Sequence, residues 1–422
     1  MSGVYVLHGP QFAADPQAFY ADMRQRYGAI APVEIAPDVT AHLVISYRAA
    51  LDLLRDEQTW SKDVRRWQAT LPPDSPVLGM LGWRPNALFA DGPTHTRYRQ
   101  VITDAFARVQ PHHLRQLVQD LADQLIDTFA PAGRADLVGQ YARLLPLHLF
   151  NRLYGLDDDR ATELIDSLAQ IVQSGDQADE GNRRFLAYMT DLVAAKQRRP
   201  GHDITSWILN HPNRLTEEEA LHHAIVTLGA GQEPTTHLIS NALSRMLSDD
   251  DYYATYSDGT LTPQQAINIV LRSEPPLANY GAHVARHDTR LHGHDIRAHT
   301  LVLISYAAAG SDPDGPGSNP ASGTGAHLAW SAGPHQCPVR EPAMLIATTA
   351  IEALAARCTD LQLEIPREQL PWRTGALHRA LDNLPVRFTP TSPRRTERNT
   401  AWHSNPFTAS VSTPPAPTCP VR

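Results

Sequence analysis

The chain of 422 residues is 42% hydrophobic, which suffices for a large buried core, and it carries a formal net charge of −8. This acidic balance, with no basic stripe, excludes an extended nucleic-acid surface. Three cysteines in so long a chain exclude a disulfide scaffold and indicate a reducing compartment. No apolar run approaches the roughly 20 residues that cross a membrane, and residues 1–10 show no secretory signal. We therefore expect a cytoplasmic protein that binds neither nucleic acid nor a membrane.

Helical periodicity dominates the first half of the chain, where apolar residues recur at spacings of three and four. Two short strands interrupt this pattern early, over 31–35 and 41–46, on either side of a Pro-Asp turn. The helices predicted around and after them cover residues 15–27, 47–54, 95–106, 114–128, 137–154, 159–173 and 183–196.

A capping box opens the longest predicted helix. Thr216 is its N-cap and Glu219 stands three residues later, so that each side chain can bond the backbone N–H of the other. The helix is predicted to extend to about Leu247, which is long for a globular protein. The elements predicted beyond it are a helix over 263–272, strands within 283–308 with a buried one at 301–304, and strands and turns over 361–388.

No internal repeat or linker divides residues 1–388, so we predict one large domain that is mainly α with minor β. Residues 389–422 are different, because they are rich in Pro, Ser, Thr and Arg and poor in large apolar side chains. This composition predicts a disordered tail. A tail docked in a groove, with Trp402 and Phe407 as anchors, is the alternative.

Cys337 gives the clearest chemical signal in the chain. It follows a Gly/Pro loop and precedes an apolar run at helical spacing over 343–358. A thiolate at the start of a helix is stabilised by backbone N–H groups and the helix dipole. Such a thiolate is suited to be an axial ligand of heme iron. A buried structural cysteine is the alternative that this loop alone leaves open.

The loop resembles the heme-binding loop of the cytochrome P450 family, Phe-Gly-x-Gly-x-His/Arg-x-Cys-x-Gly. Three positions match this pattern, namely Gly333, His335 and Cys337. Three others depart from it, namely Trp330, Ser331 and Val339. The resemblance extends over roughly residues 10–388, with further motifs in the order of the family. It implies the cytochrome P450 heme-thiolate fold, heme b as cofactor and Cys337 as the axial ligand of the heme iron.

Further positions correspond to residues with which the family binds the heme propionates. His95 and Arg99 lie four apart on one helix face and match the His-x-x-x-Arg pair of the family. His335 would add a donor from the cysteine loop. Where the family has an arginine beyond a Pro-Pro turn, this chain has His283. Arg286 is its rival, but it would point to the opposite face of a strand, so His283 is preferred.

The long helix carries Ala-Gly-Gln-Glu-Pro-Thr over residues 230–235, which is similar to the Ala-Gly-x-Asp/Glu-Thr pattern of the family. The resemblance implies that Ala230 and Gly231, together with Leu277, line the substrate pocket. It also assigns Glu233 to the relay of protons toward the reaction site, the role of a general acid.

Pro234 departs from this pattern, because it stands where the family has a hydroxyl-bearing residue. Proline has neither a hydroxyl nor an N–H, so we expect a kink in the helix near Ala230. Thr235 follows about 100° further round the helix. Whether Thr235 takes the catalytic role of the missing hydroxyl, or ordered water or substrate groups do, is left open.

The charge network that supports the cysteine loop in the family is incomplete here. In the Glu-x-x-Arg motif the glutamate is replaced by Ile269 and only Arg272 remains. The meander before the cysteine loop, residues 312–320, contains no arginine to complete the network. Because a single unpaired buried charge is costly, the joint loss suggests a rebuilt support. Arg272 is expected to bind backbone carbonyls or Glu274.

The resemblance implies a bacterial enzyme that activates dioxygen to oxidise an organic substrate in secondary metabolism. The chain has no nucleotide-binding fingerprint, so ferredoxin and ferredoxin reductase are the expected electron donors. Hydroxylation of a small molecule and oxidative cross-linking of aromatic groups in a peptide or natural product both stay open. The alternative is a heme protein without oxygenase turnover, a ligand sensor or interaction partner, and the replaced residues motivate it.

Overall fold

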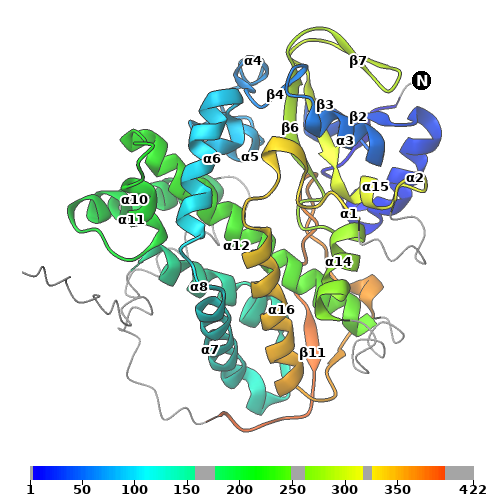
Figure 1. The fold of residues 1–422 in the computed structure, drawn as a ribbon. Coiled ribbons are helices and arrows are strands. Elements are labelled where there is room, and N and C mark those ends of the chain that lie inside the picture. Colours follow the sequence, from blue (N-terminus) through cyan, green and yellow to red (C-terminus); the bar gives the residue numbers. More distant parts are fainter. Residues whose placement is uncertain (1–2, 157–175, 249–261, 317–325, 395–422) are drawn as a thin grey trace, which may run out of the picture.

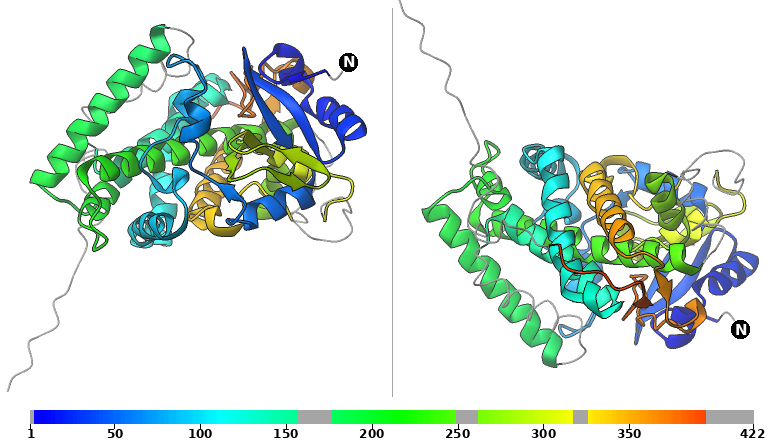
Figure 2. Two further views of the ribbon diagram at one scale, coloured as in Figure 1. Left: turned by 90° about the horizontal axis from the view of Figure 1, so that it is seen from above. Right: turned by 90° about the horizontal axis from the view of Figure 1, so that it is seen from below.

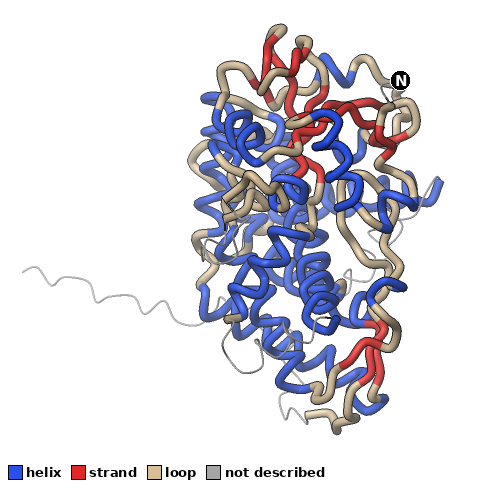
Figure 3. The backbone as a smooth tube through the Cα atoms, turned by 90° about the vertical axis from the view of Figure 1, so that its right-hand side faces the viewer, coloured by secondary structure: helices blue, strands red, loops and turns tan. Residues whose placement is uncertain are grey.

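The computed structural model describes residues 3–156, 176–248, 262–316 and 326–394. Helices form most of this part of the chain, and strands gather in separate regions of the molecule (Figure 3). The mainly α fold with minor β that the sequence predicts is therefore confirmed. Within the described ranges, no helix is both long enough and apolar enough to cross a membrane.

The larger sheet contains six strands in the order β1-β2-β3-β9-β6-β4. In chain order they are β1 (Tyr5–Val6), β2 (Ile30–Ala36), β3 (Val39–Val44), β4 (Trp60–Ser61), β6 (Asn279–Ala285) and β9 (Leu301–Ser305). β9 runs parallel to β3 and antiparallel to β6, and every one of its residues is buried. The buried strand predicted at 301–304 is thus confirmed, and its unbroken apolar run reflects cover on both faces.

Two smaller sheets complete the strand regions. β7 (Thr289–Leu291) and β8 (His294–Ile296) form a hairpin, and β10 (Gln362–Leu363), β11 (Pro385–Arg387) and β5 (Arg134–Asp136) form a three-stranded sheet. β11 lies far from β3 and β6 of the large sheet, with helices between them (Figure 1).

The helices follow the predicted order. They are α1 (Pro10–Ala14), α2 (Pro16–Tyr27), α3 (Tyr47–Arg55), α4 (Arg65–Gln68), α5 (Leu78–Leu81), α6 (Gly92–Phe106), α7 (Pro111–Phe129), α8 (Leu144–Tyr154), α10 (Asp176–Arg198), α11 (Ile204–Leu209), α12 (Glu217–Ser248), α14 (Pro263–Ser273), α15 (Tyr306–Gly310) and α16 (Arg340–Arg357). The helix predicted over 159–173 lies outside the described residues.

The single helix predicted over 137–154 is wrong in one respect. A π-helical turn, η3 (Val138–Ala142), precedes α8, and the regular helix begins only at Leu144. Pro146 lies in the first turn of α8 and has no N–H to give to the carbonyl four residues earlier. The side chain of Asp136 instead accepts the backbone N–H groups of Val138 and Gly139, which starts the wider turn.

The long helix α12 runs through the middle of the molecule (Figure 2). The capping box is confirmed, since the Glu219 N–H donates to Thr216 Oγ1 at 3.2 Å and the Thr216 N–H donates to Glu219 Oε2 at 2.9 Å. Glu219 also accepts from Arg97 Nη2 at 2.5 Å and from the Tyr98 hydroxyl at 2.6 Å, both on α6. The start of α12 is thereby tied to α6.

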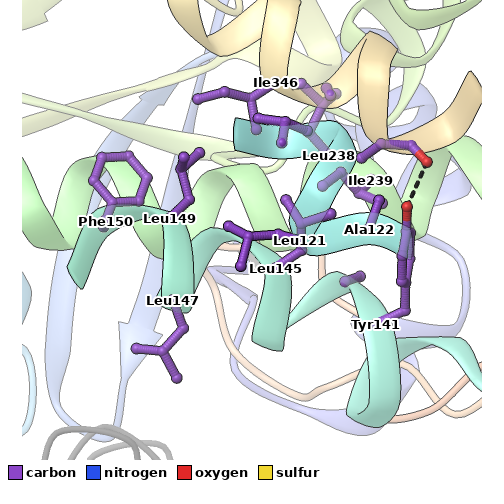
Figure 4. Close-up of a cluster of buried hydrophobic side chains, with 14 of the residues drawn as sticks. Leu121, Ala122, Tyr141, Leu145, Leu147, Leu149, Phe150, Leu238, Ile239 and Ile346 are labelled. Carbon is purple, nitrogen blue, oxygen red and sulfur yellow. Dashed lines mark hydrogen bonds between the residues drawn. The ribbon is translucent and has the colours of Figure 1, made fainter. Parts of the chain in front are cut away.

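The largest core cluster lies where α7, α8, α12 and α16 meet (Figure 4). Leu121, Leu145, Leu238 and Ile346 supply one buried side chain from each of these helices. The Tyr141 hydroxyl, fully buried beside them, donates to the Ala350 carbonyl at 2.6 Å, so its polar group is satisfied. Burial of this apolar surface is what holds α12 in place.

Gly231 on α12 faces α8 at close range. A Cβ at Gly231 would lie 2.4 Å from the ring of Phe150, so glycine is required for the packing of the two helices. The sequence assigned Gly231 to the substrate pocket, and that role stays a prediction. Across Pro234 the helix continues as one element, although the Ala230 carbonyl loses its usual N–H donor there.

The described chain continues to Arg394, past the predicted domain boundary at 388. Thr391 N–H donates to the Ala130 carbonyl at 3.1 Å, and Arg394 N–H donates to Asp127 Oδ1 at 3.0 Å, so residues 389–394 lie along the end of α7. The rest of the predicted tail, with Trp402 and Phe407, lies outside the described residues.

Substituting Gly231→Ala should lower the free energy of unfolding by about 1–3 kcal/mol, because the added methyl group enters the space of the Phe150 ring. Gly229→Ala is the matched control on the same helix, since no described atom lies within 4 Å of its Cβ position. The control should be neutral or stabilising, by up to about 1 kcal/mol from helix propensity. Denaturant unfolding of both variants measures the difference, and equal effects would contradict the packing argument.

Candidate functional site

Cys337 lies in a tight loop that its own backbone closes. The Cys337 N–H donates to the Trp330 carbonyl at 2.8 Å, and the short 3-10 turn η5 (Gly333–His335) comes just before the cysteine. Gly333 has a φ of +66°, and a Cβ at this position would lie 2.2 Å from the Leu54 carbonyl oxygen. Glycine is therefore required both for the backbone conformation and for the close approach to α3.

The helix expected after Cys337 is confirmed, because α16 begins at Arg340. The expected stabilisation of a free thiolate is not confirmed. Burial raises the pKa of the Cys337 thiol, and the lowering effects of the Val339 N–H and of the Arg99 and Arg340 charges do not outweigh it. Burial of the thiol outweighs the stabilising effect of the nearby helix terminus, so deprotonation of the thiol depends on a bound cation such as a metal ion.

Basic side chains from several elements converge beside this loop. His95 and Arg99 come from α6, His335 from η5 and His283 from β6, while Lys62 follows β4 directly. The rings of His95 and His335 stack with their centroids 3.9 Å apart. Arg99 Nη2 donates to the Gln336 carbonyl, next to the cysteine. The structure thus gathers the four residues that the sequence predicted for one site and adds Lys62, which is only 4% exposed.

Burial lowers the pKa values of the basic groups in this cluster, although Lys62 stays mainly charged at neutral pH. Burial lowers the pKa of Lys62 to about 8 and that of His95 to about 4. Burial and the nearby positive groups hold the pKa of His335 and of His283 well below the ordinary value. Such shifts are expected where several cationic groups share a dry space without an anion to compensate them.

Asp91 compensates the cluster only in part, because its charge raises the pKa of Lys62 and of His95 less than burial lowers them. Asp91 also accepts from the Lys62 backbone N–H at 3.0 Å and from Arg286 Nη2 at 3.0 Å. Arg286 is thereby engaged by Asp91, and the choice of His283 over Arg286 stays a prediction. The Glu57 carboxylate is exposed, and an oxygen of it lies within 4.8 Å of a ring nitrogen of each of His95 and His335. A carboxylate is thus a compatible neighbour for the stacked rings.

Buried polar atoms in this cluster have no partner among the described residues. They are Nε2 of His95, Nε2 of His335 and the indole Nε1 of Trp330. Buried polar groups are normally hydrogen-bonded, so unpartnered nitrogens around a basic cluster indicate a bound group with several anionic oxygens. The two carboxylates of a porphyrin, with a metal ion facing Cys337, satisfy both requirements of this donor set.

Glu233 on α12 belongs to a second group of polar residues. His237 Nε2 lies 3.3 Å from Glu233 Oε2, and the ring of His378 meets the His237 ring edge-to-face at 5.4 Å between centroids. His378 forms an isolated β-bridge with Leu277, which brings the predicted pocket residue Leu277 beside this group. Thr235 is buried, and its hydroxyl donates to the Gly231 carbonyl at 2.6 Å.

Ala230 is exposed although most of the helix around it is buried. α12 crosses the middle of the molecule (Figure 2), and Ala230 lies near the middle of this helix. This position agrees with the predicted role of Ala230 in a pocket, which stays a prediction.

Three residues of these two groups escaped the sequence analysis. Lys62 carries no local signal, because only its burial by the tertiary structure distinguishes it from a surface lysine. His378 likewise lies in an irregular segment. His237, in contrast, stands four residues after Glu233 on a predicted helix, and that spacing places both side chains on one face.

Acidic residues near the cysteine loop make contacts that the sequence did not predict, whereas the expected partners of Arg272 stay a prediction. The carboxylate of Glu274 is bound by Arg367 Nη2 at 2.5 and 2.6 Å, so Glu274 ties α14 to η6 (Arg367–Gln369). The buried Asp312, in the meander, accepts the Tyr47 N–H of α3 at 2.7 Å. Arg272 lies near His327, whose pKa falls to about 4 through burial and the Arg340 and Arg272 charges.

Comparison with known proteins places this geometry in context. No family model matches the chain. The cytochrome P450 monooxygenase PikC of Streptomyces venezuelae is 31% identical over 392 residues, which cover 90% of this chain and 92% of PikC. The mycinamicin IV hydroxylase/epoxidase of Micromonospora griseorubida is 30% identical, over 71% of this chain and 79% of the relative.

The fold is found in solved structures of the same kind. The structure of the cytochrome P450 enzyme CxnD, for C–S bond formation in chuangxinmycin biosynthesis, matches with a TM-score of 0.80 and 25% identity. The match covers 93% of this chain and 99% of that one. Together with the identity and coverage of the curated relatives, this shows that the chain belongs to the cytochrome P450 family and is an enzyme of the monooxygenase type.

Proposed function

We propose that the chain binds heme b between α12 and the cysteine loop and oxidises a small organic substrate in bacterial secondary metabolism. The observation that carries the proposal is the position of Cys337 beside a buried basic cluster whose imidazole nitrogens lack partners. Membership of the family implies heme iron as the cofactor. When bound, heme supplies activation of dioxygen, favoured by electron donation from an axial thiolate.

The residues of this chain divide the binding of heme between them. Cys337 would hold the iron, and its buried thiol would lose its proton on binding the metal. Lys62 and Arg99 would bind the carboxylates as cations, and His95, His335 and His283 as hydrogen-bond donors. Ala230 would lie on the opposite side, where its small side chain leaves room for the substrate.

Hydroxylation of a small molecule is the reaction that the relatives favour. PikC is a monooxygenase and the mycinamicin relative is a hydroxylase/epoxidase. Bond formation between substrate atoms is the second candidate, because CxnD forms a C–S bond and Pro234 removes a hydroxyl-bearing residue from α12. We propose ferredoxin and ferredoxin reductase as electron donors and the cytoplasm as the location, as the sequence predicts.

Substituting Cys337→Ser should abolish the strongly red-shifted Soret band of the reduced protein under carbon monoxide, because that band reports an intact thiolate ligand. Cys358→Ala is the matched control, since Cys358 is buried at the far end of α16. The control should keep the band. Absence of the band in the unsubstituted protein would overturn the assignment of Cys337.

Substituting Lys62→Met should speed the loss of heme to excess apomyoglobin by about tenfold or more, which corresponds to one charged hydrogen bond. Methionine keeps the apolar stem and removes only the cation. Arg48→Met removes one positive charge from an exposed position on α3 and should leave the rate unchanged. Equal rates in all three proteins would show that Lys62 does not hold the cofactor.

Oxidation of NADPH with a generic ferredoxin and reductase separates the enzyme from a heme sensor. We expect NADPH consumption to rise on addition of macrolides from a test panel, with formation of oxidised products detected by mass spectrometry. Tight binding of a macrolide without any oxidation would instead favour the sensor.

A further inference from the structure

Glu233, His237 and His378 form an acid–base group in which His237 is buried and the other two residues are half-buried. Glu233 and His237 are four residues apart on α12, with Glu233 Oε2 and His237 Nε2 at 3.3 Å. His237 is only 4% exposed as a side chain. His378 reaches it from the segment before β11 and is anchored by its bridge to Leu277.

The two imidazoles are poised to gain or pass protons. Both ring nitrogens of His237 and Nδ1 of His378 are enclosed without a hydrogen bond among the described residues, and Nε2 of His237 has only the 3.3 Å contact with Glu233 Oε2. Enclosed imidazole nitrogens without partners are uncommon in proteins and call for a role or a bound molecule such as water. Each imidazole can carry a proton on either nitrogen, so a ring can accept at one edge and donate at the other.

The reaction proposed above requires such a group. Insertion of one oxygen atom, R–H + O2 + 2e− + 2H+ → R–OH + H2O, consumes protons that must reach a water-poor interior. Pro234 offers no hydroxyl, and the Thr235 hydroxyl is committed to the Gly231 carbonyl at 2.6 Å. The helix hydroxyl nearest to Glu233 in the sequence is therefore occupied as a donor.

We propose that His237 replaces the missing hydroxyl of α12 and, together with His378, supplies protons to Glu233. This inference rests on the proposed monooxygenase function and adds the route by which protons arrive. His237 and Glu233 touch along one helix face, so the transfer between them needs no movement of the backbone.

The proton balance of the relay is closed. As Nδ1 of a neutral His237 accepts a proton from water, directly or through His378, the Nε2–H proton of the same ring passes to Glu233 Oε2. This leaves a neutral imidazole, now protonated on Nδ1, and a carboxylic acid. Glu233 would give this proton to the oxygen that is reduced in the pocket and return to the carboxylate. The imidazole returns to its first tautomer by exchanging protons with water at both nitrogens, with no net proton transfer. The electrons come from reduced ferredoxin and do not pass through these residues.

The electrostatics of the group keep Glu233 ionised at rest, so that it holds a proton only transiently. Burial opposes ionisation of Glu233, but the His237 hydrogen bond and the charges of His237, Arg373 and His378 lower its pKa to about 2. Burial, with the nearby His237, lowers the pKa of His378 to about 3. Glu233 therefore rests as a carboxylate that can accept a proton, and it is a strong donor once protonated. Arg373 is itself bound to Asp382 at 3.1 Å.

The test substitutes His237→Gln, which keeps the size and a hydrogen-bond donor but cannot become an imidazolium. NADPH-driven oxygen consumption is measured with a generic ferredoxin and reductase and no added organic substrate. We expect the rate to fall by about tenfold or more, the hydrogen peroxide released per NADPH to rise, and the solvent deuterium isotope effect to change. Thr236→Val is the control, because it removes a buried hydroxyl one residue away that donates only to the Gln232 carbonyl. Unchanged kinetics in His237→Gln would overturn the proposal.

A second measurement does not depend on turnover. The Glu233 carboxyl is titrated by carbon-13 NMR in the carbon monoxide complex of the full protein, with Glu233→Gln to assign the signal. In the unsubstituted protein Glu233 should stay ionised down to pH of about 2, whereas His237→Leu should move its midpoint toward the ordinary value of 4.5. An unmoved midpoint would show that His237 does not act on Glu233.

The two measurements separate failure of the relay from failure of the proposed function. A protein without the red-shifted carbon monoxide band and without oxygen consumption would fail as a monooxygenase before the relay is tested. A protein with both, in which Thr235→Val rather than His237→Gln raises peroxide release, would keep the function and overturn the relay.

Discussion

The burial of several basic side chains with only partial compensation by acids is the constraint on which the site depends. Removing cations from water is costly unless an anion compensates them, and several kcal/mol per ion is the usual scale. Lys62, Arg99 and the three imidazoles beside them come from the large sheet, from α6 and from the cysteine loop. Their common need for an anion therefore couples these elements to one another through the bound cofactor.

The cysteine loop is held by contacts that differ from those of the resembling family. Gly333 lets the loop touch the end of α3, and Asp312 fixes the start of the same helix. Farther away, the ion pair between Glu274 and Arg367 joins the end of α14 to η6. These contacts are partly buried hydrogen bonds, so neither Glu274 nor Asp312 is left as an unpaired charge.

One face of α12 packs closely against α8, and another face carries Glu233 and His237, so the packing of this helix affects the position of the acid–base pair. On one face Gly231 must be small because Phe150 of α8 lies against it. That contact sets the rotation of the helix, and the rotation in turn decides where Glu233 and His237 point. A substitution on the packed face should therefore also change the positions of Glu233 and His237. The free energy of unfolding and the proton supply should for this reason be measured on the same variants.

The sequence by itself determined most of the described helices, the buried strand at 301–304 and the capping box at Thr216, since these depend on periodicity and local capping chemistry. The resemblance to the family singled out His95, Arg99, His283, His335 and Cys337, whose roles stay predictions. Only the tertiary structure decided that Lys62 is buried, that His378 meets His237, and that Glu274 binds Arg367. These contacts join residues far apart in the chain, so local propensities and spacing carry no trace of them. Burial also raises the pKa of the Cys337 thiol more than the nearby backbone N–H and arginines lower it, an effect that the local sequence does not show.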